Sequence, residues 1–158
     1  MITTNINGVT LFIPYLQISF KKERTMRKLL MTSFVYCLLG LASGVYYREF
    51  TKYNDFTGDT QLSVIHTHLL MLGMFMFLIV LVLEKNFQIM SSKNFKLFYY
   101  LYNAGLIVTV TLFVIKGSIT VLGGTTGSAL AGMAGLGHIL LTVGLVYLFI
   151  ILFEKIKK

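Results

Sequence analysis

Hydrophobic residues gather in four long runs, and polar residues lie in the short stretches between them. The runs cover residues 29–47, 63–83, 97–115 and 129–153. A helix needs about 20 mainly apolar residues to cross the hydrocarbon core of a membrane, and each run approaches or exceeds that length. Because the connections are short, neighbouring helices should be antiparallel. The pattern predicts an all-α integral membrane protein, a four-helix bundle with up-down-up-down order.

Composition supports a membrane location for nearly the whole chain. Hydrophobic residues make up 56% of the 158 residues and charged residues only 13%, whereas about 25% of a soluble domain is charged. The mean hydropathy is +0.77. We therefore expect one four-span membrane domain over residues 26–158, in contact with the lipid bilayer and with no separate soluble domain.

The first 25 residues fit this pattern less well. The segment VTLFIPYLQISF is apolar but too short to span, and Pro14 interrupts it. Cations directly precede the first span, so Met26 reads as the natural start of the domain. We expect residues 1–25 to be an extension outside the core. The alternative is an interfacial helix that lies on the cytoplasmic face.

The distribution of positive charge predicts the orientation in the membrane. The net charge is +8, and five basic residues lie in 21–28, three in 84–96 and three in the final EKIKK. These segments alternate along the bundle, and only Arg48, Lys52 and Lys116 fall on the other side. Such a bias places both termini in the cytoplasm. It also explains the basic character without nucleic-acid binding.

All three histidines, His66, His68 and His138, lie inside predicted spans. Ionisable side chains are costly in a bilayer and usually mark a functional site there. Histidine is also the commonest metal ligand. The three histidines are therefore the candidate metal-binding or cofactor-binding residues.

Helix geometry restricts how these histidines can cooperate. Positions two apart differ by about 200° around a helix, so His66 and His68 should face different neighbours. A compact tri-histidine zinc or copper site is disfavoured unless the helix breaks at Thr67. By contrast, His138 and either residue of the pair can lie at one depth in the outer half of the bilayer. Two imidazoles from two helices at one depth are typical of six-coordinate haem.

Four further residues fit a haem site. Gly73 and Gly135 would give a macrocycle room, although small residues also let membrane helices pack closely. Arg48 and Lys116, at the outer ends of spans, would pair with haem carboxylates. The alternative for Arg48 is a surface ion pair with Glu49.

From Met26 onward the chain resembles an uncharacterised bacterial family of four-span membrane proteins, the domain of unknown function 2871 family. The resemblance is carried by VYYREFTKYNDFTGDTQLSVIHTHLLMLG, KLFYYLYNAGL and AGLGHILL. It implies a multi-pass protein of the bacterial cytoplasmic membrane and assigns no activity.

The segment HTHLLMLG is also similar to a histidine-bearing span of the haem-copper oxidase catalytic subunit. That resemblance implies a low-spin haem ligated by His66 or His68, with His138 from a later span as the second ligand. The copper-binding histidine set of the oxidase has no counterpart here, so oxygen reduction is not implied.

The leading hypothesis is a b-type haem used in electron transfer or haem handling. A covalent attachment is not expected, because the chain has no CxxCH motif. One alternative is a copper or zinc permease or chaperone, and another is a cofactor-free subunit of a membrane complex. A redox partner or a second copy of the chain would be the protein partner. The sequence assigns no catalytic reaction.

Overall fold

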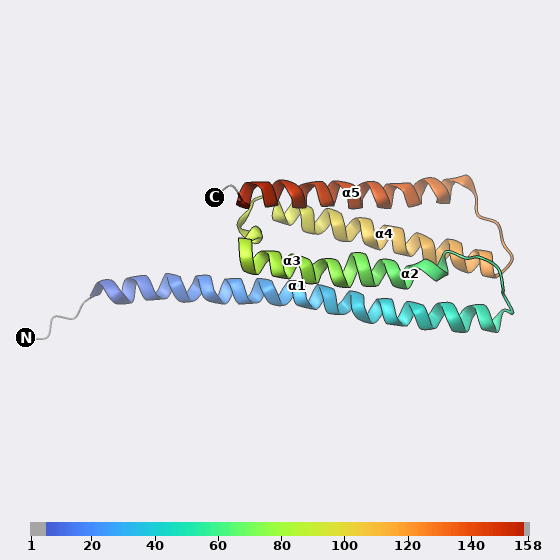
Figure 1. Cartoon of the computed structure of the whole chain (residues 1–158), viewed down its shortest axis with the longest axis horizontal. Coiled ribbons are helices and arrows are strands. Elements are labelled where there is room, and N and C mark those ends of the chain that lie inside the picture. Colours follow the sequence, from blue (N-terminus) through green and yellow to red (C-terminus); the bar gives the residue numbers. More distant parts are fainter. Residues whose placement is uncertain (1–5, 157–158) are drawn as a thin grey trace, which may run out of the picture.

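Four long helices form the protein in a computed structural model that describes the backbone of residues 6–156 (Figure 1). Side chains are described for residues 23–156 except 25, 128, 129, 131 and 134. The elements are α1 (Ile6–Tyr53), α2 (Leu62–His68), η1 (Leu69–Phe75), α3 (Met76–Phe87), η2 (Ile89–Ser91), α4 (Phe95–Val121) and α5 (Ser128–Ile156). No strand occurs in the described backbone. The predicted all-α fold is confirmed.

The four predicted spans coincide with these helices. The segments long and apolar enough to cross a membrane are Met26–Tyr53, Leu62–Phe87, Phe95–Val121 and Gly135–Ile156. Consecutive helices are antiparallel, so α1 begins and α5 ends at the same end of the molecule (Figure 1). We call this the basic end, because it carries the cation-rich segments, and the opposite end the outer end. The chain is a multi-pass membrane protein.

Helix α1 is longer than expected because it continues through Pro14. A proline removes one backbone hydrogen bond and bends a helix, but the residues on either side can remain helical. The expectation of an interruption at Pro14 was therefore wrong. The first part of α1 extends beyond the other helices (Figure 1).

Removing residues 1–25 is expected to leave membrane insertion and the free energy of unfolding unchanged, because this segment precedes the four spans. The measurement is membrane fractionation and thermal unfolding of the truncated chain beside the full-length chain. A truncated protein that no longer inserts would show that the segment is structural.

Helices α4 and α5 pack closely against each other, and glycines explain why. A Cβ built on Gly105 would lie 2.6 Å from the amide nitrogen of Leu141, and one on Gly144 would lie 3.0 Å from Cα of Tyr102. Small residues let membrane helices approach until their backbones touch. The position of α5 is therefore fixed by contact with the α4 backbone.

The second span contains a wide turn, the π-helix η1, between α2 and α3. The neighbouring helices supply hydrogen bonds to two of its carbonyl oxygens. Tyr102 donates its hydroxyl to Leu72 O at 2.9 Å, and Ser33 donates to Met74 O at 2.9 Å. In lipid, an irregular backbone is tolerated where protein groups satisfy it. Side chains of α1 and α4 thus stabilise the π-helix.

An aromatic cluster fills the core beside η1 on the side of the basic end. Phe77 lies at its centre, with ring centroids 5.9 Å from Tyr36, 5.7 Å from Tyr99 and 5.9 Å from Tyr102. Tyr36 donates its hydroxyl to Oδ1 of Asn103 at 2.7 Å. These contacts hold α1, the second span and α4 together, while the histidines lie nearer the outer end.

Candidate histidine site

His66 and His68 face different helices, as their spacing predicted. A Cβ built on Gly44 of α1 would lie 3.8 Å from Cβ of His66. The ring of His68 instead meets Phe113 of α4 edge-on, with centroids 5.1 Å apart and planes at 89°. The helix remains regular through Thr67, so the two rings do not converge.

The tautomer of His68 follows from its hydrogen bond. Nδ1 lies 2.9 Å from the carbonyl oxygen of Val64, one turn earlier on α2. A carbonyl only accepts, so Nδ1 carries the proton and donates it. The lone pair of the neutral ring is then on Nε2. Metal-binding histidines usually donate their second ring N–H to a carbonyl or carboxylate in this way, which fixes the ring and raises its basicity.

His138 meets the same phenylalanine from a third helix. The ring centroids of Phe113 and His138 are 6.2 Å apart, with planes at 53°. Phe113 of α4 is thus in contact with both His68 of α2 and His138 of α5. Two histidines that contact one ring lie at a similar level along the bundle. We call these three residues the outer histidine site.

His66 lies outside this site. Its Nδ1 is buried and has no hydrogen-bond partner among the described residues. Its Nε2 lies 3.4 Å from the hydroxyl of the adjacent Thr67, a long contact. Of the two histidines that compete to pair with His138, the structure brings His68 to the shared ring and turns His66 toward α1.

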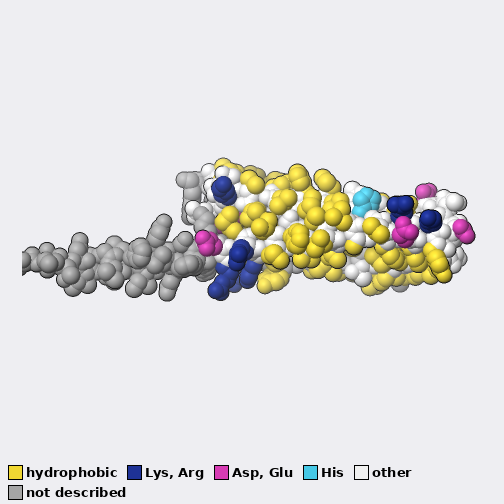
Figure 2. All heavy atoms as spheres, turned by 90° about the horizontal axis from the view of Figure 1, so that it is seen from below, with side chains coloured by type: hydrophobic (Ala, Val, Ile, Leu, Met, Phe, Trp, Pro, Cys, Tyr) yellow, Lys and Arg dark blue, Asp and Glu magenta, His cyan; other side chains and the backbone are white. Residues whose placement is uncertain are grey.

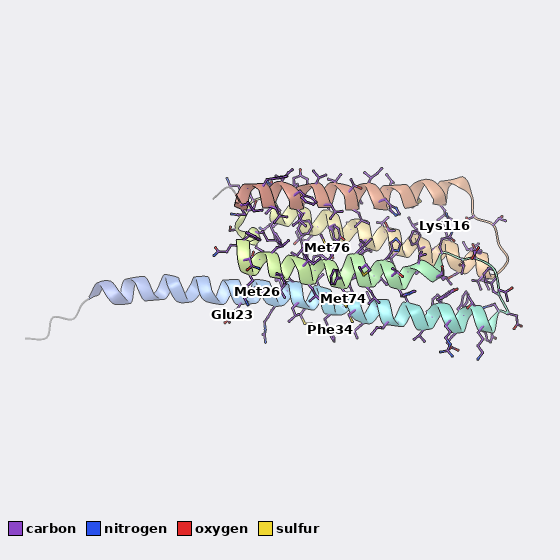
Figure 3. The ribbon with its side chains drawn as sticks, in the orientation of Figure 1. Glu23, Met26, Phe34, Met74, Met76 and Lys116 are labelled. Carbon is purple, nitrogen blue, oxygen red and sulfur yellow. The ribbon has the colours of Figure 1, made fainter. Side chains whose placement is uncertain are left out.

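The two predicted cations lie in different surroundings. Lys116 follows Phe113 by three residues, so it lies one turn further out on the same face of α4, and Figure 3 shows it toward the outer end. Arg48 is on α1, where its exposed side chain contacts Glu49 at 3.6 Å. Lys116 is therefore the cation associated with the outer histidine site. For Arg48 the structure shows the surface ion pair.

The two glycines expected to leave room for a macrocycle, Gly73 and Gly135, also lie in different surroundings. A Cβ on Gly73 would lie 2.5 Å from Cγ of Tyr36, so the tyrosine ring already fills that space. Gly135 lies one turn before the histidine of α5. A Cβ added to it would meet no atom within 4 Å among the described residues. Of these two glycines, only Gly135 leaves room beside the histidines.

Sequence reasoning did not identify Phe113 or Thr109, which lies one turn further inward. Thr109 is fully buried, and its hydroxyl has no hydrogen-bond partner among the described residues. Thr109, Phe113 and Lys116 recur at helical spacing on one face of α4. This stripe was a visible signal, but nothing in the sequence indicated that it faces the histidines.

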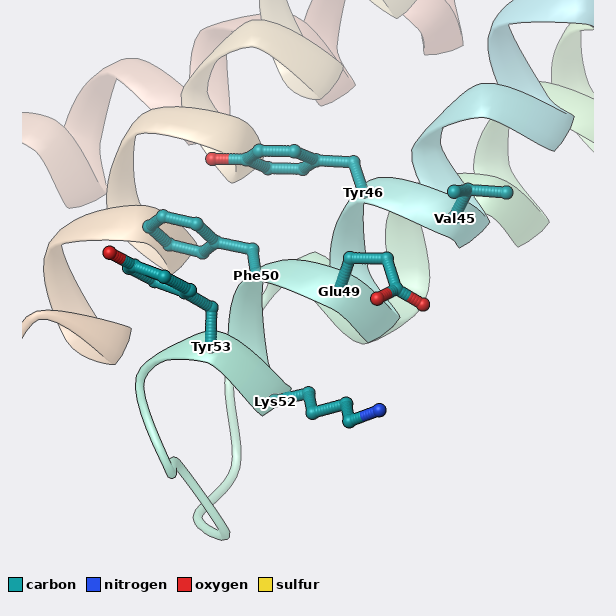
Figure 4. Close-up of a pocket in the computed structure, with 6 residues that line it drawn as sticks. All are labelled: Val45, Tyr46, Glu49, Phe50, Lys52 and Tyr53. Carbon is teal, nitrogen blue, oxygen red and sulfur yellow. The ribbon is translucent and has the colours of Figure 1, made fainter.

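A separate hollow of about 590 Å³ lies against the outer end of α1 and contains none of the histidines. Figure 4 shows the rings of Tyr46, Phe50 and Tyr53 on one side of the helix end. Tyr46 and Phe50 stack with centroids 5.1 Å apart. Aromatic side chains at this level are typical of the membrane–water interface, so this surface needs no ligand to explain it.

Comparison with known protein families gives a match over most of the chain. Residues 26–155 match the family model described as protein of unknown function (DUF2871). No curated protein and no solved structure matches the chain, so the similarity of HTHLLMLG to the haem-copper oxidase subunit gains no support. The family match covers nearly all of the four spans and begins where the extension was expected to end. The chain belongs to the DUF2871 family of proteins of unknown function.

Proposed function

We propose that this protein binds one b-type haem through His68 and His138 and serves as an electron-transfer protein of the bacterial cytoplasmic membrane. The observation that supports the proposal most is the convergence of the two imidazoles, from α2 and α5, on the ring of Phe113. The site lies toward the outer end, so electrons would enter or leave on that side of the membrane.

The number of available ligands favours haem over a single metal ion. A haem iron takes two axial side chains, because the macrocycle supplies the other ligands. Zinc sites take three or four protein ligands. Among the described residues, no group of three His, Cys, Asp or Glu side chains is close enough to hold a metal ion. Two histidines are thus sufficient for a haem and too few for a typical zinc site.

The surrounding residues fit the group with one rearrangement. The Nδ1–H bond of His68 leaves Nε2 as the lone-pair nitrogen. Gly135 leaves space beside His138, and Lys116 supplies a cation for a carboxylate on the outer side. The ring of Phe113 contacts both imidazoles, so its side chain would have to turn aside to admit the macrocycle. When bound, the haem would supply reversible one-electron transfer.

Each residue then has a definite task. His68 is held in one orientation and one tautomer by Val64, which lowers the cost of ordering the ligand on binding. His138 is exposed on α5 and lies where a redox partner or a second copy of the chain can approach. Lys116 would neutralise a carboxylate that would otherwise be partly desolvated.

The proposal is tested by titrating haem into purified full-length protein and recording visible spectra before and after dithionite. We expect saturation at one haem per chain, with the sharp reduced bands of a low-spin, bis-histidine site. Elemental analysis of the same preparation tests the copper or zinc alternative. Stoichiometric copper or zinc, together with no saturable haem spectrum, would overturn the proposal and favour the permease or chaperone.

A further inference from the structure

A second hollow, of about 420 Å³, lies between α1 and α4 toward the basic end. Its apolar walls are formed by Met31, Val35, Leu39 and Ile107. Each of these side chains is about half exposed, from 48% for Val35 to 57% for Met31. No described part of the chain covers them, so in a membrane this groove opens to lipid.

The polar side chains on the floor of the groove are already bonded to one another. The hydroxyl groups of Thr32 and Tyr99 are 2.8 Å apart, and Tyr36 donates to Oδ1 of Asn103 at 2.7 Å. Asn103 in turn donates from Nδ2 to Tyr99 O at 2.7 Å. A polar ligand would have to compete with these bonds. The groove therefore fits an apolar chain along its length.

Cations lie at the basic end of the groove. Lys28 lines it directly. Arg24 lies four residues before Lys28 on α1, and Lys96 lies three residues before Tyr99 on α4. Each is therefore one turn nearer the basic end on the same face of its helix. All three cations are exposed, and Glu23 is the one acid beside them on α1. Figure 2 shows Lys and Arg side chains gathered at this end of the molecule.

The length of the groove matches one leaflet. Eleven residues separate Lys28 from Leu39, which corresponds to about 16 Å along the helix. Half of a hydrocarbon core is about 15 Å thick. A head group at the cations would thus place its acyl chain along the apolar walls as far as the middle of the bilayer.

We propose that this groove binds one anionic phospholipid of the cytoplasmic leaflet, with its phosphate at Lys28, Arg24 and Lys96 and an acyl chain between α1 and α4. Basic pockets between membrane helices on the cytoplasmic side are suited to anionic head groups. The apolar walls and the internally bonded floor accommodate an acyl chain. The cations favour an anionic head group over a zwitterionic one. The proposal is independent of haem binding.

The chain contains no tryptophan, so a single introduced tryptophan reports on one position. Leu39→Trp places it in the groove, and Leu38→Trp is the matched control. The two leucines are adjacent and each is 50% exposed, but only Leu39 lines the groove. Each full-length variant is reconstituted in phosphatidylcholine with a minor fraction of phosphatidylglycerol. In separate samples, either the phosphatidylglycerol or the phosphatidylcholine carries bromine on its acyl chains, where it quenches tryptophan fluorescence.

Brominated phosphatidylglycerol should quench Leu39→Trp well beyond its mole fraction and quench Leu38→Trp in proportion to it. Each Lys or Arg near a membrane surface contributes roughly fivefold to binding of anionic lipid. The excess quenching of Leu39→Trp by phosphatidylglycerol should therefore disappear when Arg24→Gln, Lys28→Gln and Lys96→Gln are added to that variant. Lys85→Gln, at an exposed cation on the basic end outside the groove, should retain it.

Three results would overturn the proposal. Equal quenching of Leu38→Trp and Leu39→Trp would show that the groove is not a lipid site. Quenching of Leu39→Trp by brominated phosphatidylcholine as strong as that by phosphatidylglycerol would show a site without head-group selection. An excess that survives the triple glutamine substitution would show that these cations do not hold the head group.

Discussion

His68→Ala is expected to abolish the low-spin haem spectrum, whereas His66→Ala should leave it in place. Only His68 shares the Phe113 ring with His138. Loss of an outer-shell partner alone typically costs about 10–100-fold in metal affinity, so loss of the ligand itself should cost more. The measurement is the visible spectrum and haem affinity of each variant. His138→Ala should behave like His68→Ala.

Two controls separate loss of a ligand from loss of the fold. Circular dichroism should show the same helix content in His66→Ala, His68→Ala and His138→Ala. Added imidazole should enter the space left in His68→Ala and restore part of the low-spin spectrum. If His66→Ala loses the spectrum while His68→Ala keeps it, the ligand assignment is wrong. If neither variant changes it, α2 does not supply an axial ligand.

Gly105→Ala is expected to lower the free energy of unfolding by about 1–3 kcal/mol, the usual cost of overpacking. The added Cβ would lie 2.6 Å from the backbone nitrogen of Leu141, which cannot move without displacing α5. The measurement is unfolding of the protein in detergent micelles by titration with dodecyl sulfate, followed by circular dichroism.

Gly132→Ala is the matched control for this substitution. Nothing described lies within 4 Å of the position its Cβ would take. Alanine favours a helix over glycine by about 1 kcal/mol in water, so this variant should be as stable as the natural protein or more stable. Equal destabilisation by both substitutions would show that the α4–α5 contact is not the tight backbone contact described above.

The features predictable from sequence are those that depend on one helix alone. Span length and apolar content predicted the four helices, and the two-residue spacing predicted that His66 and His68 diverge. The partner of each histidine depends on how α4 and α5 are rotated, which is fixed by close contacts at Gly105 and Gly144. Helix packing of this kind leaves no periodic signal, so Phe113 was not identified.

The π-helix could not be predicted from the sequence either, because its residue spacing gives no clear signal in an apolar span. Buried Ile65, Leu69, Gly73 and Phe77 recur every four residues. At 100° per residue, such a stripe would wind by about 120° around a regular α-helix. The wide turn keeps it on the packed side of the bundle. In a span where almost every residue is apolar, this spacing does not stand out.

The direction of His68 therefore depends on a residue count as well as on residue identity. Because η1 begins directly after His68, the loss or gain of one amino acid in 69–75 would turn α2 by about 100° relative to α3. A family member with the same histidine but a second span of different length would present that imidazole to another helix. A histidine at this position in a relative is therefore not enough to assign it the same ligand role. The number of residues between that histidine and the residue equivalent to Phe77 must agree as well.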